Sequence, residues 1–345
     1  MTKAELTELL IDANIEVVQS VLHDLPRKNS LEIAQDWYNN LNGVKFSDWG
    51  KDLFSYSIPI KEIKIPSEMI ILCLNNDKKA EHILVNYLQR QLNKKENQFF
   101  FGANRIKELF VKLESRSPKD SPFAYDYKLR RTNPLRNAEE IVAALMSSMR
   151  TFEDVIMLLR IKKQIILHIR PFYSIPKRCE WRVFVKNKKI VGISQQFYDE
   201  FFDYDREYIS TAEGRIRDFI DNIVKYNVHA RSFVADIVLY NTREPIKLVS
   251  GISSFCQIIE TNPYGLSDPC LFKDYKELES KKEFISDLED KALEKARPEL
   301  YRQAEHSAAS KLAALFLDLG LGMRIKLNPN DAALIEGKNK TSLKK

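Results

Sequence analysis

The sequence predicts an α+β fold with mixed and antiparallel sheets, on two observations. Short runs rich in β-branched and aromatic residues recur along the chain, at 109–113, 165–170, 181–185, 190–195, 233–240 and 258–261. Segments with helical periodicity separate several of them, at 138–150, 152–159 and 211–226. The runs on either side of 186–189 predict a hairpin, which favours α+β over a doubly wound parallel sheet.

The chain begins and ends with predicted helices. Residues 2–25 carry an apolar helical stripe that ends near Pro26, and residues 30–41 form a second helix. A strand-like stretch at 56–65 and a helix at 79–92 follow, and 99–101 fits either a strand or a core helix. At the other end, 297–319 predicts a long helix that packs on the body, ahead of a basic tail.

Composition excludes several classes of protein. At 345 residues and 44% hydrophobic, the chain can build one large or two ordinary domains. It contains neither GxxxxGK[ST] nor GxGxxG, no CxxC and no HExxH, which argues against Walker, dinucleotide and zinc sites. No apolar run reaches about 18 residues. We therefore expect no membrane association and a cytoplasmic location, or a host cytoplasm if the source is a bacterium.

The stretch 258–272, IIETNPYGLSDPCLF, reads as a strand that stops at a proline-glycine turn. Glu260 and Asn262 are two residues apart and so share one face of that strand. A carboxylate and an amide oxygen at a strand end suit Mg²⁺, which prefers oxygen ligands. The alternative is an exposed strand end with a solvated glutamate and a turn-forming Asn-Pro.

Lys112 lies in the run 109–113 and faces either solvent or a cleft. The turn that follows, SRSPKDSP at 115–122, is dense in hydroxyls and cations, and Ser117 and Lys119 lie within it. Backbone N–H groups and positive charge in such a turn can bind phosphates. The alternative is an exposed turn.

Arg182 and Asp236 are charged residues in runs that otherwise look buried. Arg182 shares a face with Glu180 and needs an anion, either Glu180 itself or a phosphate. Asp236 interrupts the apolar run FVADIVLY, and a buried aspartate must be paired, bound to a metal or held by backbone amides.

Together these residues are the types that a binding site for a nucleotide with Mg²⁺ needs: oxygen ligands for the metal and cations for the phosphates. The run IILHIR, which contains Leu167 and His168, would supply main-chain hydrogen bonds to an adenine edge. Its alternative is an ordinary core strand.

The order of motifs resembles that of the cell division cycle protein 123 family, a divergent clade of the ATP-grasp fold. The similar pieces lie between residues 46 and 278 and are FSDW, FVKLESRSPKDS, EWRVFVKNKKIVGISQ, FVADIVL and IIETNPYG…LF. This chain has Glu260 where the family usually has aspartate. The connection from Asp236 to Glu260 is longer than the family pattern, which leaves the strand register there open.

The resemblance implies a two-lobe ATP-grasp-like fold that sandwiches ATP, with an added N-terminal helical region. The regions are 1–45 (helical), 46–160 (lobe with Lys112 and the phosphate loop), 161–280 (lobe with metal and phosphate residues) and 281–345 (C-terminal helix and tail). By this resemblance Lys112, Lys119 and Arg182 contact phosphates, and the strand around Leu167 forms the adenine hinge. Asp236, Glu260 and Asn262 hold Mg²⁺.

The resemblance also implies a protein partner, because eukaryotic family members are ATP-binding assembly chaperones for translation initiation factor two. One alternative is an ATP-dependent ligase that forms an acyl-phosphate and modifies a protein or peptide, so whether ATP is turned over stays open. A nucleic-acid-binding protein is indicated only by the net charge of +6 and the lysine-rich end, and nucleic acid is not expected as the partner.

Overall fold

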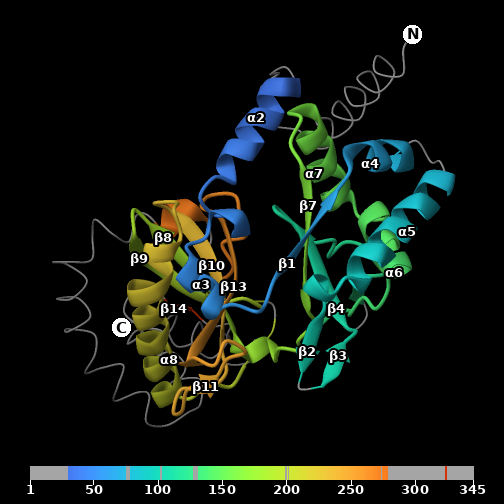
Figure 1. Cartoon of the computed structure of the whole chain (residues 1–345). Coiled ribbons are helices and arrows are strands. Elements are labelled where there is room, and N and C mark those ends of the chain that lie inside the picture. The colour runs from blue at the N-terminus through green and yellow to red at the C-terminus, as the bar shows by residue number, and fades with distance from the viewer. Residues whose placement is uncertain are drawn as a thin grey trace, which may run out of the picture. The chain divides into compact units, whose positions relative to one another are not determined.

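The computed structural model describes residues 30–74, 78–101, 103–126, 131–198, 200, 202–272, 274–278 and 323–324. The chain divides into two compact units (Figure 1). Unit 1 comprises the described parts of 1–47 and 58–174, and unit 2 those of 48–57 and 175–345. The helices predicted at 2–25 and 297–319 and the basic tail lie outside the described residues.

Unit 1 is built on a three-stranded antiparallel sheet, in the order β1 (Lys61–Ile65), β7 (Ile165–Pro171) and β4 (Leu109–Leu113). Because side chains alternate between the two faces of a strand, the sheet has one apolar and one polar face. Leu167 lies on the apolar face and is fully buried. The strand predicted at 109–113 is confirmed.

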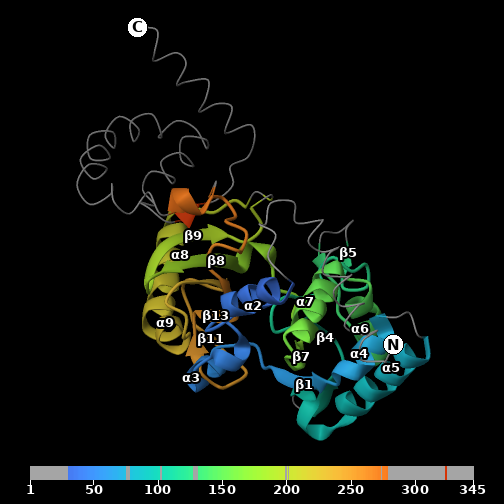
Figure 2. The same ribbon diagram turned by 90° about the horizontal axis from the view of Figure 1, so that it is seen from above.

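Helices cover the apolar face of this sheet. Figure 2 shows α5, α6 and α7 gathered beside β4 and β7. The helices of unit 1 are α2 (Ser30–Asn40), α4 (Ser67–Leu74), α5 (Lys78–Asn93), α6 (Ala138–Met146) and α7 (Met149–Arg160). They share one hydrophobic core with the sheet, and α2 joins α7 through a smaller cluster. Unit 1 also carries two short hairpins, β2 (Phe99–Phe101) with β3 (Asn104–Ile106) and β5 (Tyr125–Asp126) with β6 (Arg131–Thr132).

The boundary between α6 and α7 differs from the predicted one. The sequence analysis extended the first helix to residue 150, whereas α6 ends at Met146 and α7 begins at Met149. Ser148 is the reason, because its hydroxyl accepts a hydrogen bond from the Thr151 N–H at 3.1 Å and so caps α7.

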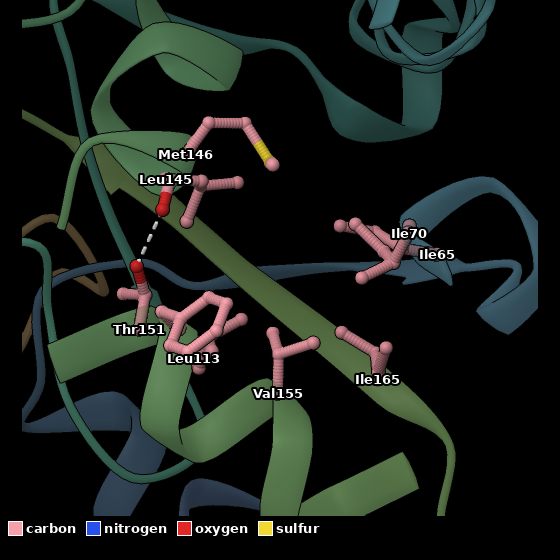
Figure 3. Close-up of a pocket in the computed structure, with 9 residues that line it drawn as sticks. Ile65, Ile70, Leu113, Leu145, Met146, Thr151, Val155 and Ile165 are labelled. Atoms are coloured by element: carbon pink, nitrogen blue, oxygen red, sulfur yellow. Dashed lines mark hydrogen bonds between the residues drawn. The ribbon is translucent and has the colours of Figure 1, made fainter. Parts of the chain in front are cut away.

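The core of unit 1 contains a cavity of about 20 Å³ (Figure 3). It is lined by apolar side chains and Thr151, from β1, β4, β7 and the helices α4, α6 and α7: Ile65, Ile70, Leu113, Leu145, Met146, Phe152, Val155 and Ile165. The Thr151 hydroxyl donates to the Leu145 carbonyl at 2.7 Å. The cavity has room for about one water molecule, so the core is close-packed around it.

Unit 2 is built on a five-stranded sheet in the order β13-β10-β8-β9-β14. The strands are β8 (Glu180–Lys186), β9 (Lys189–Gln195), β10 (Phe233–Leu239), β13 (Cys256–Pro263) and β14 (Met323–Arg324). The predicted hairpin through 186–189 is confirmed as β8–β9. Unit 2 also contains α8 (Arg206–Phe219), the π-helical segment η4 (Ile220–Val224) and α9 (Lys225–Asn227), and α8 contacts β13.

The chain after β13 folds back over part of this sheet. Phe272 and Leu278 pack on Phe184 and Val234 in one cluster. A Cβ atom at Gly192 would lie 2.5 Å from the Leu278 side chain, so glycine permits this close approach. The stretch 258–272 therefore does more than end a strand: its second half covers the sheet.

The connection from β10 to β13 contains the short hairpin of β11 (Ile246–Lys247) and β12 (Ser253–Ser254). β10 and β13 pair as antiparallel neighbours, with Asp236 directly opposite Glu260 and a register shift after Asp236. The longer connection therefore forms its own hairpin, and the register that the sequence left open brings the two carboxylates together.

A segment from early in the sequence belongs to unit 2. It consists of the end of η1 (Phe46–Asp48), Trp49, α3 (Lys51–Ser55) and the residues up to Ser57. The Trp49 indole N–H donates to the Thr261 hydroxyl at 2.8 Å, and the Ile258 N–H donates to the Tyr56 carbonyl at 2.9 Å. Trp49 of the FSDW motif and the chain that follows it thus hold β13 in place.

Two lobes at 46–160 and 161–280 were expected, flanked by regions at 1–45 and 281–345, and the two units have other boundaries. The predicted limit at 160/161 falls within unit 1, because β7 is the central strand between β1 and β4. The α+β fold class with mixed and antiparallel sheets is confirmed, since β14 pairs with β9 in parallel and the other strand pairs among the described residues are antiparallel. Among the described residues, no helix is long and apolar enough to cross a membrane.

Candidate functional site

Charged residues line up across the sheet of unit 2. Arg182 on β8 lies directly opposite Asp236 on β10, and Asp236 lies directly opposite Glu260 on β13. Directly opposite residues of antiparallel strands share a face, with Cβ atoms about 4.5–5.5 Å apart. Asn262, two residues beyond Glu260, shares that face. The sheet therefore brings together four of the residues that the sequence singled out.

Arg182 and Asp236 form a buried bidentate ion pair. Arg182 Nε lies 2.7 Å from Asp236 Oδ1, and Nη2 lies 2.8 Å from Oδ2. Arg182 Nη1 donates to the Asp268 carbonyl at 3.0 Å. Two residues that each needed a partner thus satisfy each other, so the anion beside Arg182 is Asp236 and not Glu180.

The ion pair holds the charge on the guanidinium. Burial by itself would lower the pKa of Arg182, but the field and hydrogen bonds of Asp236 raise it above its usual value. Cys270 and Glu260 add smaller contributions in the same direction. Glu260 therefore lies close enough to act electrostatically on the same guanidinium.

The oxygen atoms of this row fit a hard cation. Asp236 accepts three hydrogen bonds, two from Arg182 and one from Asn262 Nδ2 at 3.2 Å, and a carboxylate has about four acceptor sites. Because the Asn262 amide donates through its nitrogen, its oxygen is the atom that remains for a cation. The Glu260 carboxylate is only partly buried. Carboxylate and amide oxygens are the ligands that Mg²⁺ prefers.

The Asp268 carbonyl is a contact of this site that the sequence analysis did not include. It follows the turn after β13, where the Cys270 N–H donates to Asp268 Oδ1 at 2.8 Å. The SDPC sequence at 267–270 is a turn signal, but a turn signal does not say which side chain the turned carbonyl will meet.

The polar face of the unit 1 sheet carries a second row of charged residues. Glu62 on β1, His168 on β7 and Lys112 on β4 lie directly opposite one another. Lys112 is 2% exposed, and its Nζ lies 4.9 Å from the centre of the Phe46 ring. Lys112 is therefore shielded from solvent, so the solvent alternative is wrong, and its ammonium contacts an aromatic ring.

His168 is neutral in this setting. Burial lowers the pKa of its imidazole, with the charges of Lys112 and Arg170 acting in the same direction, to about 3. The His168 ring meets the Phe46 ring edge-on, with centroids 5.0 Å apart. The imidazole therefore carries one N–H and one lone pair at neutral pH.

This low pKa makes the stability of the protein depend on pH. The folded value, about 3, lies below the ordinary value of 6.5, so the unfolded state binds more protons between these pH values and acid destabilises the fold. Between pH 6.5 and 5 we expect His168 to remove about 2 kcal/mol from the free energy of unfolding. Urea titrations at both pH values should show this loss in the wild type and in His229→Gln, a control at an exposed histidine. The loss should be missing in His168→Gln. If the free energy of unfolding changes equally with pH in all three proteins, the prediction is wrong.

The serine-rich loop after β4 is tied to α7. Ser115 donates to Asp154, and Arg116 binds Asp154 Oδ1 through Nε at 2.9 Å and Nη2 at 2.6 Å. Ser148 and the Arg150 N–H bind Asp120. Arg116 is one of the cations for which the sequence suggested a phosphate-binding turn. In the structure its guanidinium is paired with carboxylates instead. Within the loop Lys119 is exposed and Ser117 is buried.

Leu167 does not share a face with Lys112. Its side chain lies in the core, and β7 pairs with a strand on each side at this position, opposite Ile63 and Leu113. The main chain at Leu167 is therefore engaged in the sheet rather than available to an adenine edge, whereas His168 lies on the polar face.

Comparison with known proteins identifies the family of this chain. The D123 family matches residues 89–316, which is more than half of the chain. Among solved structures, Cdc123 from Schizosaccharomyces pombe is similar with a TM-score of 0.51 at 20% identity, covering 70% of this chain and 92% of that one. This likeness confirms the fold expected from the resemblance.

Curated relatives match a shorter part. A translation initiation factor eIF2 assembly protein from Kluyveromyces lactis is 32% identical over 145 residues, 42% of this chain and 34% of the relative. One from Sclerotinia sclerotiorum is 27% identical over 110 residues, 32% of this chain and 24% of the relative. The match thus spans 34% or less of these relatives' length, whereas the family match covers β4, β7, β8, β10 and β13. The chain belongs to the D123 family, the Cdc123 family that its sequence motifs resemble.

Proposed function

We propose that this chain binds ATP with Mg²⁺ and acts on a protein partner. The observation that carries the proposal is the row of Arg182, Asp236 and Glu260 across three adjacent strands, with Asn262 on the same face. It places a cation suited to phosphate beside oxygen ligands suited to Mg²⁺.

In unit 2, Asp236, Glu260 and Asn262 would hold Mg²⁺, and Arg182 would contact a phosphate. A guanidinium has five N–H donors, and Asp236 and the Asp268 carbonyl use three of them. Cys270 also lies within hydrogen-bonding range of Arg182, so at most two donors remain for a phosphate oxygen. The bound ion would neutralise charge on the phosphates. The ion pair keeps Arg182 in place before any ligand arrives.

In unit 1, Lys112 is the cation that we propose for phosphate contact, since it lies on the polar face and is held against Phe46. Lys119, exposed on a loop that is anchored to α7, and Ser117 beside it are the further candidates. The anchoring favours this role, because a loop held in place loses less conformational entropy when it binds a ligand.

For the partner, we propose a translation initiation factor of the eIF2 type, because the relatives carry the name of eIF2 assembly proteins. This role would place the chain in the cytoplasm. Release of ADP and phosphate only in the presence of a protein or peptide acceptor would instead support the ligase alternative.

The test is a calorimetric titration of ATP into the wild type, with Mg²⁺ and with EDTA. Glu260→Gln removes one charge from the proposed metal site and leaves both members of the buried ion pair present, and Glu244→Gln makes the same change at an exposed position. We expect Mg²⁺-dependent binding that Glu260→Gln weakens at least about tenfold, which corresponds to about 1.4 kcal/mol.

Glu244→Gln should bind ATP as the wild type does. If the wild type does not bind ATP, the proposal is wrong. If Glu260→Gln binds ATP·Mg²⁺ with unchanged affinity, the metal-site part of the proposal is wrong while nucleotide binding stands.

A further inference from the structure

His168 is a buried polar side chain whose hydrogen-bonding capacity is unused. It is 1% exposed, and within the part of the chain that the structure describes neither ring nitrogen has a hydrogen-bond partner. The nearest carboxylate atom, Glu62 Oε1, is 3.8 Å from Nδ1, beyond hydrogen-bond distance. Buried polar groups in native proteins are nearly always hydrogen-bonded. The imidazole of His168 is therefore a candidate for a hydrogen bond to a bound ligand.

The surroundings of His168 select for an anionic partner. Lys112 lies directly opposite on β4, and Arg170, two residues along β7, faces the same way. The charges of both act on the imidazole. Glu62 opposes them from β1, but its side chain is 44% exposed and its field is screened by water. Because the charges of Lys112 and Arg170 both disfavour a proton on the imidazole, the potential at the ring is positive.

The protonation state of the imidazole suits hydrogen bonding to an anion. A neutral imidazole has one N–H to donate, and flanking cations keep it from competing as a third positive charge. Its second nitrogen is an acceptor, for which the Lys112 ammonium on the neighbouring strand is a suitable donor. The same ring could therefore bind a ligand oxygen and orient the lysine beside it.

We propose that His168 is a ligand-binding residue that donates its imidazole N–H to an oxygen of the phosphate group beside Lys112. This inference rests on the nucleotide binding proposed above and assigns His168 to the phosphates rather than to the adenine edge. Phe46, on the short helical turn η1, lies against both side chains.

The test follows the ring N–H of His168 directly by nuclear magnetic resonance. Full-length protein with ¹⁵N-labelled histidine is titrated with ATP·Mg²⁺ and, separately, with tripolyphosphate·Mg²⁺, which lacks the base and the sugar. The signals of His168 are those missing from the spectrum of His168→Gln. We expect the His168 N–H proton to move downfield and to exchange more slowly with water in both titrations.

Affinity supplies the second measurement. A hydrogen bond to a charged group predicts that His168→Leu binds ATP about 10- to 100-fold more weakly, whereas His168→Gln, which keeps an N–H donor, loses less. His229→Leu, at an exposed histidine, should bind as the wild type does. This order among the variants separates lost hydrogen bonding from lost packing.

Three results would overturn the inference, and they differ in what they leave standing. If ATP binds while the His168 signals and the affinity of His168→Leu stay unchanged, a fixed water satisfies the imidazole and the proposed function survives. A shift with ATP but not with tripolyphosphate places the contact on the base or sugar and ends the phosphate assignment. If the wild type does not bind ATP, the proposed function and this inference fail together.

Discussion

Replacing Asp236 with asparagine is expected to lower the free energy of unfolding of unit 2 by about 3–5 kcal/mol. The substitution keeps the shape of the side chain but removes the charge that faces Arg182. Arg182 is 7% exposed, so its charge would remain buried with only the Asp268 carbonyl and an amide as partners. In the wild type, the attraction of Asp236 offsets the free-energy cost of burying the Arg182 charge. In the variant this cost would lower the free energy of unfolding without compensation.

The double variant Arg182→Met/Asp236→Leu separates the cost of a broken pair from the value of the intact one. Replacing both members of a buried pair with apolar side chains of similar size is often close to neutral. Urea unfolding, with hydrogen exchange to locate the loss in β8 and β10, should rank the double variant above Asp236→Asn. The control is Arg217→Gln, whose i,i+4 partner is Glu213 on α8 and whose loss should stay within about 1 kcal/mol. A loss for Asp236→Asn no larger than this would count against the prediction.

Replacing Arg116 with methionine is expected to destabilise unit 1 by a similar amount, about 3–5 kcal/mol at pH 7. Asp154 is fully buried, and Arg116 and Ser115 are its partners. Burial raises the pKa of Asp154, and Arg116 opposes that rise. Without Arg116 the carboxyl must either stay charged in the core or take up a proton.

That choice makes the loss depend on pH in a defined direction. An acid whose folded pKa lies above its unfolded one binds more protons when folded, so its contribution to stability improves as pH falls. The deficit of Arg116→Met relative to the wild type should therefore be smaller at pH 5 than at pH 7. Arg136→Gln, which loses an ion pair with Glu108 in which both side chains are about half exposed, serves as the control. A deficit that is equal at both pH values would mean that Asp154 is not the group responsible.

Local patterns in the sequence predicted most of the secondary structure of the described residues. The run 109–113 became β4, and EWRVFV and FVADIVLY became β8 and β10 with the expected alternation, so that Trp181 and Val183 are core residues and Arg182 is not on their face. The helix boundary at Ser148 was misplaced because a serine cap and an interior serine look alike until the chain around them is folded.

Individual residue types also showed where chemistry must lie. An arginine and an aspartate in buried strands each demand a partner, and this followed from desolvation alone. That the partner of Arg182 is Asp236 did not follow, because the two residues are 54 positions apart in the sequence. In the serine-rich loop, likewise, the sequence showed a cation at Arg116 but not that Asp154 already neutralises it.

The sequence by itself thus determined the fold class, the strands and the face on which each candidate residue lies. These depend on the period-2 alternation of a strand, which is a local property. Only the tertiary structure decided which candidates meet: Arg182 with Asp236, Asp236 with Glu260 and Lys112 with His168. The register between two strands is set by the packing of a whole buried face, and a slip of one residue would turn every one of these side chains to the other side of the sheet.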